Sequence, residues 1–128
     1  MTRTEDVIRS ILGPCRSGIR PLVLAVDRAI ELMYDQGLDR EDIKLARDIY
    51  PAVAERKALR PGGGQIKPES AGKAVQRLCN LCWDTLVRRE LVEKYIGDVI
   101  PDIGSASDMV FYLAHYVRTG RAFFRRRR

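Results

Sequence analysis

The sequence has few of the residues that carry enzyme or metal chemistry, and it lacks a long apolar run. It contains one histidine and three cysteines in 128 residues. A small, odd number of cysteines argues against a disulfide framework and fits a reducing compartment. The apolar runs, such as Leu22 to Val26, are all far shorter than the roughly 20 residues that a transmembrane helix needs. No basic segment precedes an apolar stretch at the N-terminus, so we expect a cytoplasmic protein with no membrane partner.

Length and apolar spacing predict one helical domain. A chain of 128 residues, 45% hydrophobic and 31% charged, buries enough surface to fold without disulfides or metal. Apolar side chains recur at helical spacing and no segment alternates like a strand, so we expect an all-α fold of six to seven helices. The domain is expected over residues 1–120, followed by a basic, disordered tail over residues 121–128.

Capping residues, glycines and prolines predict the limits of the helices. Pro51 is tolerated only in a first turn, so we expect it to end the third helix and open the fourth. A cap formed by Ser105, or by Ser107 and Asp108, is expected to start the last helix, which ends at Gly120. The other expected helices cover residues 4–12, 19–36, 39–49, 52–57, 68–89 and 91–96.

Positive charge is concentrated in the middle of the chain. The chain has 23 Lys and Arg against 17 Asp and Glu, a net charge of +6. Residues 51–89 carry eight basic and three acidic side chains, whereas residues 1–50 carry eight and nine. Clustered Lys and Arg favour a surface for a polyanion, because phosphate contacts release counterions. A solvated basic face gives the same count, so charge alone leaves both interpretations open.

The expected helix 68–89 separates into an apolar stripe and a polar face. The stripe consists of Ala71, Val75, Leu78, Cys82 and Thr85 or Leu86, and the polar face of Glu69, Lys73, Gln76, Arg77, Asn80 and Asp84. A short helix, a turn and a longer helix with polar outward side chains form the layout of a helix-turn-helix, whose second helix enters the major groove. Any amphipathic helix pair in a bundle gives the same pattern.

The segment from Ile49 to Lys57 resembles a motif of a known family. It reads Ile-Tyr-Pro-Ala-Val-Ala-Glu-Arg-Lys and is similar to the Leu-Tyr-Pro-x-Val/Ile-Ala-Lys-Lys segment in the DNA-binding effector domain of the stage-zero sporulation protein A family. Other segments agree in order, so the resemblance spans residues 7–119: Ala29-Ile30 with Met33-Tyr34, and Ala74-Val75-Gln76-Arg77 with Trp83.

The resemblance implies a bacterial transcriptional regulator of sporulation type that contains a helix-turn-helix. Its partner is double-stranded DNA, read as short boxes that are often in tandem, so self-association on tandem sites is possible in this interpretation. No constellation of side chains supports an enzyme, a cofactor or a small-molecule substrate. We expect contacts to bases or nearby phosphates from Ser70, Lys73, Gln76, Arg77 and Asn80, and contacts to the DNA backbone from Lys57, Arg60 and Lys67.

Departures from the family leave an alternative open. The family has a Glu-Arg pair where this chain has Gly72-Lys73, and an arginine where this chain has Gln76, so its base preference is expected to differ. The expected turn, residues 58–67, is 10 residues long and rich in glycine. Glycine inside a helix costs roughly 1 kcal/mol relative to alanine. The alternative is a non-enzymatic protein-interaction module on a degenerate fold, recognised by an apolar outward face on helix 68–89.

The remaining motifs are expected to be structural. Cys79 and Cys82 have metal-ligand spacing, but neither Cys15 nor His115 has the spacing of a partner, so we expect core packing and no metal. The glycines at 62–64 lack the lysine of a phosphate-binding loop. The four arginines at 125–128 suit either a polyanion or plain solvation.

Overall fold

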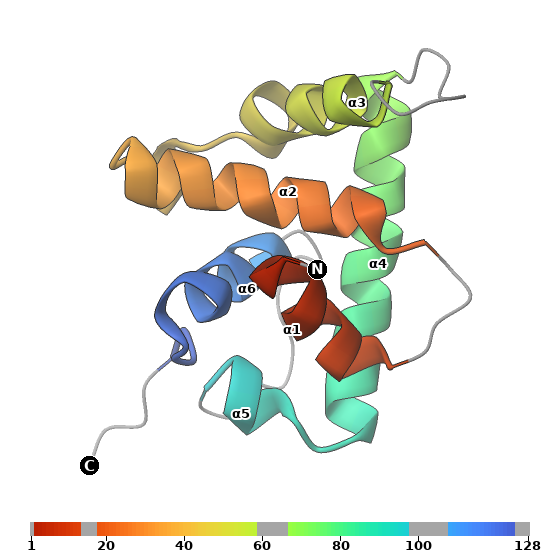
Figure 1. Ribbon diagram of the computed structural model, residues 1–128, viewed down its shortest axis with the longest axis vertical. Coiled ribbons are helices and arrows are strands. Elements are labelled where there is room, and N and C mark those ends of the chain that lie inside the picture. The colour runs from red at the N-terminus through yellow and green to blue at the C-terminus, as the bar shows by residue number, and fades with distance from the viewer. Residues whose placement is uncertain (1, 14–17, 59–66, 98–107, 125–128) are drawn as a thin grey trace.

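The computed structural model describes residues 2–13, 18–58, 67–97 and 108–124, and within these ranges the fold is all-α (Figure 1). The predicted fold class is therefore confirmed. The described elements are α1 (Arg3–Leu12), α2 (Arg20–Ile30), the π-helical η1 (Glu31–Asp35), the 3-10 turn η2 (Arg40–Asp42), the π-helical η3 (Leu45–Ile49), α3 (Tyr50–Ala58), α4 (Pro68–Arg88), α5 (Val92–Tyr95) and α6 (Asp108–Thr119).

Helix α2 lies in the middle of the molecule. Six successive residues, Pro21 to Val26, are buried, because α1, α3, α4 and α6 all pack around this helix. Helix α4 runs along one side of the molecule, with α3 across one end and α5 near the other (Figure 1). The expected helix 19–36 is observed as α2 followed directly by η1.

The first helix begins earlier than its sequence signals predicted. Thr2 is the N-cap, and its hydroxyl accepts a hydrogen bond from the Glu5 N–H at 3.2 Å. Thr4, which we expected at the start of the helix, is buried and donates to the Asp27 carboxylate of α2. Burial raises the pKa of Asp27, and the Thr4 hydrogen bond acts against that rise. Thr4 therefore joins two helices.

The segment between η1 and α3 departs from the prediction of a helix over residues 39–49. Only η2 forms at its start, because the backbone is extended at Ile43 and Lys44, and Ala46 is exposed where we expected it to be buried. The fourth helix does open at Tyr50 and Pro51 as expected, as α3, but it follows η3 without a gap. Pro51 lies in the first turn of α3, where its missing N–H costs least, and the wider turn of η3 lets the Tyr50 N–H reach the Leu45 carbonyl.

The C-terminal segment packs against the domain as far as Phe124. The Phe124 N–H donates to the Ile96 carbonyl at 2.8 Å, and its ring centroid lies 5.3 Å from that of Tyr112. Gly97 has a φ of 116°, and a Cβ there would lie 1.7 Å from the Phe124 carbonyl oxygen, so only glycine fits. Residues 121–124 of the expected tail thus make contacts, and residues 125–128 lie outside the described ranges.

Asp48 fastens the start of η3. Its carboxylate accepts the Lys44 N–H at 2.8 Å and pairs with Arg47 through two oxygens at 2.9 Å each. The hydrogen bonds from Arg47 and from the Lys44 backbone lower the pKa of Asp48 from its ordinary value of 3.8 to about 2. The ionised form is therefore favoured by folding.

This pKa predicts a small acid-dependent loss of stability. The contribution of Asp48 is complete above pH 3.8 and is lost as the pH falls toward 2, because the unfolded chain takes up the proton first. Asp48→Asn is expected to lower the unfolding free energy at pH 7 by no more than about 1 kcal/mol, since solvent screens the pair. Urea unfolding at pH 7 and pH 2 measures this, with the exposed Asp84→Asn as the control. A loss from Asp48→Asn that is equally large at both pH values would contradict it.

Candidate nucleic-acid interface

The two faces of α4 lie as its sequence predicted. The residues of the apolar stripe are buried, and the outward face is exposed at Glu69, Ser70, Lys73, Gln76, Arg77, Asn80 and Asp84. Gln76 and Arg77 follow Lys73 by three and four residues, and Asn80 follows them by four and three, so the four side chains form one row along the helix. Within the described ranges, Ser70, Lys73, Arg77 and Asn80 make no side-chain hydrogen bond or ion pair. Their polar groups face outward.

Of the three residues expected to contact the DNA backbone, the structure places only Lys67 at the helix that carries this row. Lys67 is the exposed N-cap residue of α4, directly before the helix begins and six residues before Lys73. Lys57 belongs to the last turn of α3, with a side chain outside the described part of the protein. Arg60 and most of the expected turn, residues 59–66, also lie outside it, together with the glycines at 62–64.

Arg56, counted as part of the basic excess, joins α3 to the continuous helix formed by α2 and η1. Arg56 of α3 and Arg28 of α2 both pair with the Glu31 carboxylate, at 2.8 and 2.9 Å. Burial acts to raise the pKa of Glu31, but the hydrogen bonds from Arg56 and Arg28 outweigh it and keep the pKa below its ordinary value. Sequence analysis did not predict the pairing of Arg56 with Glu31. It could have predicted the pair of Arg28 with Glu31, because residues three apart on a helix are neighbours.

Gly72 allows α3 to lie close to α4. A Cβ at Gly72 would lie 2.7 Å from Cδ2 and 2.8 Å from Cε2 of the Tyr50 ring, closer than real Cβ contacts. Tyr50 is only 8% exposed, so its ring has little room to move away. Glycine is unfavourable inside a helix, but at position 72 it leaves the room that the Tyr50 ring occupies.

A pocket of about 420 Å³ lies beside this contact, on the flank of the polar row. The Tyr50 hydroxyl is buried and makes no hydrogen bond to any residue that the structure describes. Burial raises the pKa of Tyr50, and the nearby side chain of Gln76 acts to lower it. The pocket is lined by Ala46, Tyr50, Pro68, Glu69, Gly72, Lys73 and Gln76.

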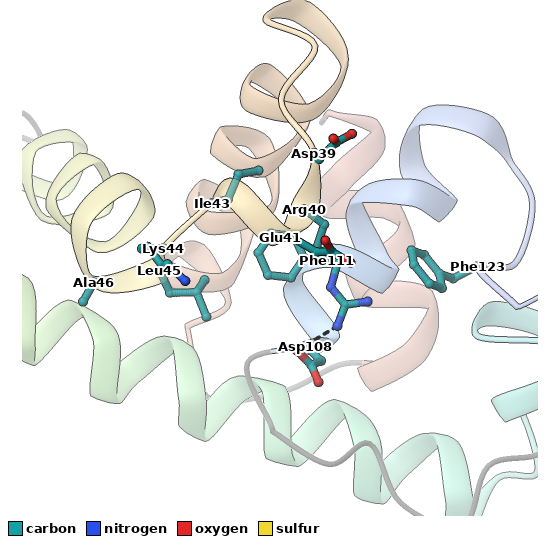
Figure 2. A pocket seen from close by; sticks show the side chains of 10 residues that line it. All are labelled: Asp39, Arg40, Glu41, Ile43, Lys44, Leu45, Ala46, Asp108, Phe111 and Phe123. Atoms are coloured by element: carbon teal, nitrogen blue, oxygen red, sulfur yellow. Dashed lines mark hydrogen bonds and ion pairs between the residues drawn. The ribbon is translucent and has the colours of Figure 1, made fainter.

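A second pocket, of about 910 Å³, shares Ala46 with the first pocket in its lining (Figure 2). Arg40 points across it and pairs with Asp108 of α6 at 3.2 Å. The Arg40 guanidinium also lies 5.5 Å from the ring centroids of Phe111 and Phe123. Because Asp108 neutralises this cation and the rings hold it, Arg40 joins η2 to α6 and adds little to a phosphate-binding surface. The lining residues are Asp39, Arg40, Glu41, Ile43, Lys44, Leu45, Ala46, Asp108, Phe111 and Phe123.

The second half of α4 has a different outward face. Leu81 and Val87 are 36% and 52% exposed, and they lie near the acidic Asp84. The outward face is thus polar and basic from Lys73 to Asn80, and mixed beyond it. A basic outward face would favour DNA binding, and an apolar one would favour the interaction module. The outward face of α4 is neither basic nor apolar along its whole length.

The cysteines of α4 and the single histidine have packing roles. Cys79 and Cys82 are fully buried, as predicted, and burial raises the pKa of the Cys79 thiol, which stays protonated at neutral pH. His115 lies with Nδ1 2.9 Å from the Tyr34 hydroxyl and with its ring against Phe123. Cys15 lies outside the described ranges, within which no group of His, Cys, Asp or Glu is arranged to hold a metal ion.

Comparisons with known proteins add no relative. The chain matches no protein-family model, no curated protein and no solved structure. In the described part of the chain, none of the helices combines the length and the apolar character needed to cross a membrane.

The contact at Gly72 predicts that Gly72→Ala destabilises the protein. An alanine gains about 1 kcal/mol in helix propensity, but overpacking against a buried ring costs about 1–3 kcal/mol. We expect a net loss of about 1 kcal/mol in urea unfolding. Gly18→Ala is the control, because nothing lies within 4 Å of its added Cβ. A Gly72→Ala protein more stable than the natural one would show that Tyr50 does not press on α4.

Proposed function

We propose that the protein is a sequence-specific DNA-binding transcriptional regulator that reads the major groove with α4. One observation carries the proposal. Lys73, Gln76, Arg77 and Asn80 form an exposed row on the first two thirds of a 21-residue helix, on the face opposite its packed stripe. A row of this kind suits a helix whose side chains reach base edges.

The residue types in the row support base recognition. Lysine and arginine donate to O6 and N7 of guanine, and the carboxamides of glutamine and asparagine bond to N6 and N7 of adenine. Lys67 stands at the start of the helix, where a cation suits a phosphate of the backbone. The expected contacts from Lys57 and Arg60 belong to the same proposal, as do those from Ser70.

The position of α3 also supports this proposal. It precedes α4 in the chain and packs against its first half through Tyr50 and Gly72. The ion pair of Arg56 with Glu31 fixes α3 on the central helix, which gives α4 a rigid support. Such an arrangement is compatible with a helix-turn-helix, and the resemblance to the sporulation effector domain favours the same function, in a bacterial cytoplasm and with self-association on tandem sites.

A second candidate is a non-enzymatic protein-interaction module. Leu81 and Val87, two of the three exposed large apolar side chains in the described ranges, lie on α4 and favour it. They lie beyond the basic row, so a partner protein would cover the second half of the helix and leave the first half free.

Base-reading and phosphate-binding residues are expected to respond differently to substitution. Lys73→Ala and Gln76→Ala should change sequence preference, each by about 5- to 100-fold at one base pair, because a good base contact discriminates by about 1–3 kcal/mol. Arg60→Ala should weaken all duplexes alike and reduce the salt slope by about 1. Binding to duplexes selected from a random library, in a salt series, measures both effects.

Lys94→Ala is the control, since it removes an exposed lysine from α5, which carries no residue of the row. Equal losses on every sequence from Lys73→Ala, Gln76→Ala and Arg60→Ala would contradict these roles. No binding to any duplex at low salt would favour the interaction module.

A further inference from the structure

The start of α2 lies beside the far end of the polar row on α4. Helices α1 and α2 both pack against α4, and α2 begins beside its middle (Figure 1). Gly18, two residues before α2, lines a pocket of about 620 Å³ together with Arg77, Asn80 and Asp84 of α4. The surface that carries the row therefore continues from α4 onto the start of α2.

Gly18 also borders a smaller pocket that contains two arginines. This pocket, which we call the arginine pocket, has a volume of about 290 Å³ and lies between α1 and the start of α2. It is lined by Glu5, Arg9, Gly18, Ile19, Arg20 and Val23. Because the two pockets share Gly18, the arginines lie next to the end of the row at Arg77 and Asn80.

Arg9 and Arg20 are not paired with any carboxylate in the part of the chain that the structure describes. Arg9 is exposed, and neither side chain makes a hydrogen bond or an ion pair with a described residue, Glu5 included. Nε of Arg20 is buried and has no acceptor among the same residues. A buried N–H without an acceptor is costly, and a phosphate oxygen would supply one.

The row on α4 has a basic group for the DNA backbone at one end only. From Lys67 to Asn80 the helix extends about 20 Å, whereas the major groove is about 12 Å wide, so a helix that crosses the groove meets a backbone strand near each end. Lys67 stands at the first end. After Arg77 the next charged side chain on α4 is Asp84, which repels phosphate. A cation for the second strand therefore has to come from another helix.

We propose that the arginine pocket is a phosphate-binding site, in which Arg9 and Arg20 hold the DNA backbone beside the bases that Arg77 and Asn80 read. This inference rests on the proposed function. Guanidinium groups bind phosphate oxygens through paired N–H donors. The first turn of α2 has no acidic side chain, so the positive end of that helix adds to the attraction. Contacts of this kind fix the register of α4 on the duplex and carry no base preference.

Arg9→Gln and Arg20→Gln each remove one positive charge and keep a polar side chain. Each should weaken binding to every duplex alike and lower the salt slope by about 1, because one fewer phosphate is neutralised. Fluorescence anisotropy measures this in a salt series, with a duplex selected from a random library and a scrambled duplex. Arg9→Lys and Arg20→Lys keep the charge and should keep the slope. Since Arg9 is exposed, its variants test the site without altering the core.

Glu5 provides a test in the opposite direction, because its carboxylate lies in the same pocket. Glu5→Gln should tighten binding to every duplex about 2- to 5-fold, since it removes an exposed negative charge next to the phosphate. Arg121→Gln is the matched control: it removes an exposed arginine beyond α6 that lines neither pocket, and it should leave the slope unchanged. Unchanged affinity in Glu5→Gln would place the phosphate elsewhere and contradict the proposal.

Neutral phosphates locate the contact on the duplex. A methylphosphonate at the phosphate held by Arg20 should weaken binding of the natural protein and have no further effect on Arg20→Gln, because the two changes remove the same contact. This phosphate should lie next to the base pair at which Asn80→Ala abolishes discrimination. A methylphosphonate effect that stays the same in Arg20→Gln at every position would overturn the proposal.

The outcomes separate this inference from the proposed function. Sequence-specific binding with an unchanged salt slope in both Arg9→Gln and Arg20→Gln would overturn the phosphate site and leave the proposed function standing. Equal binding to all duplexes, with the slope lowered in both variants, would keep the phosphate site and contradict base reading by α4. No binding to any duplex at low salt would contradict both.

Discussion

The close contact between the Tyr50 ring and the bare backbone of Gly72 sets the distance between α3 and α4. A side chain at position 72 would separate the two helices, because Tyr50 is held in the core and has little room to yield. The polar row of α4, the flanking pocket and the support from α3 all depend on this contact. The ion pair of Arg56 with Glu31 then holds α3 against the central helix, so the row is presented by a rigid frame.

The spacing of apolar residues predicted the fold well for the long helices, whose buried and exposed sides follow from their own sequence. The buried and exposed sides of α4 follow from its apolar period, and α2 follows from an apolar period too regular for a loop. The outward positions of Lys73, Gln76, Arg77 and Asn80 were therefore predictable without knowing what α4 packs against. Their surroundings were not, because the flank of α4 is formed by Tyr50 and Ala46, which come from a distant part of the sequence.

Tertiary contacts decided the features that sequence analysis missed. Proline at position 51 correctly predicted the start of a new helix, α3, but not that η3 would lead into it without a gap. Glycine at position 72 was interpreted from helix propensity alone, which says nothing of an aromatic ring arriving from another helix. Charge counting likewise treated Arg56 as part of a free basic surface, whereas Glu31 pairs with it. Propensity and composition describe a residue by itself, and the roles of Gly72 and Arg56 belong to pairs.

The proposal that the first part of α4 reads DNA is tested most directly by an NMR titration with a duplex selected from a random library. The account predicts that the largest shifts fall on side chains and amides of the row from Lys73 to Asn80, with smaller changes at Lys67. Residues around the Arg40 and Asp108 pair should stay unperturbed, since that pocket lies on a different part of the surface. Shifts centred on Leu81 and Val87, or on the Arg40 pocket, with the row unmoved, would contradict it.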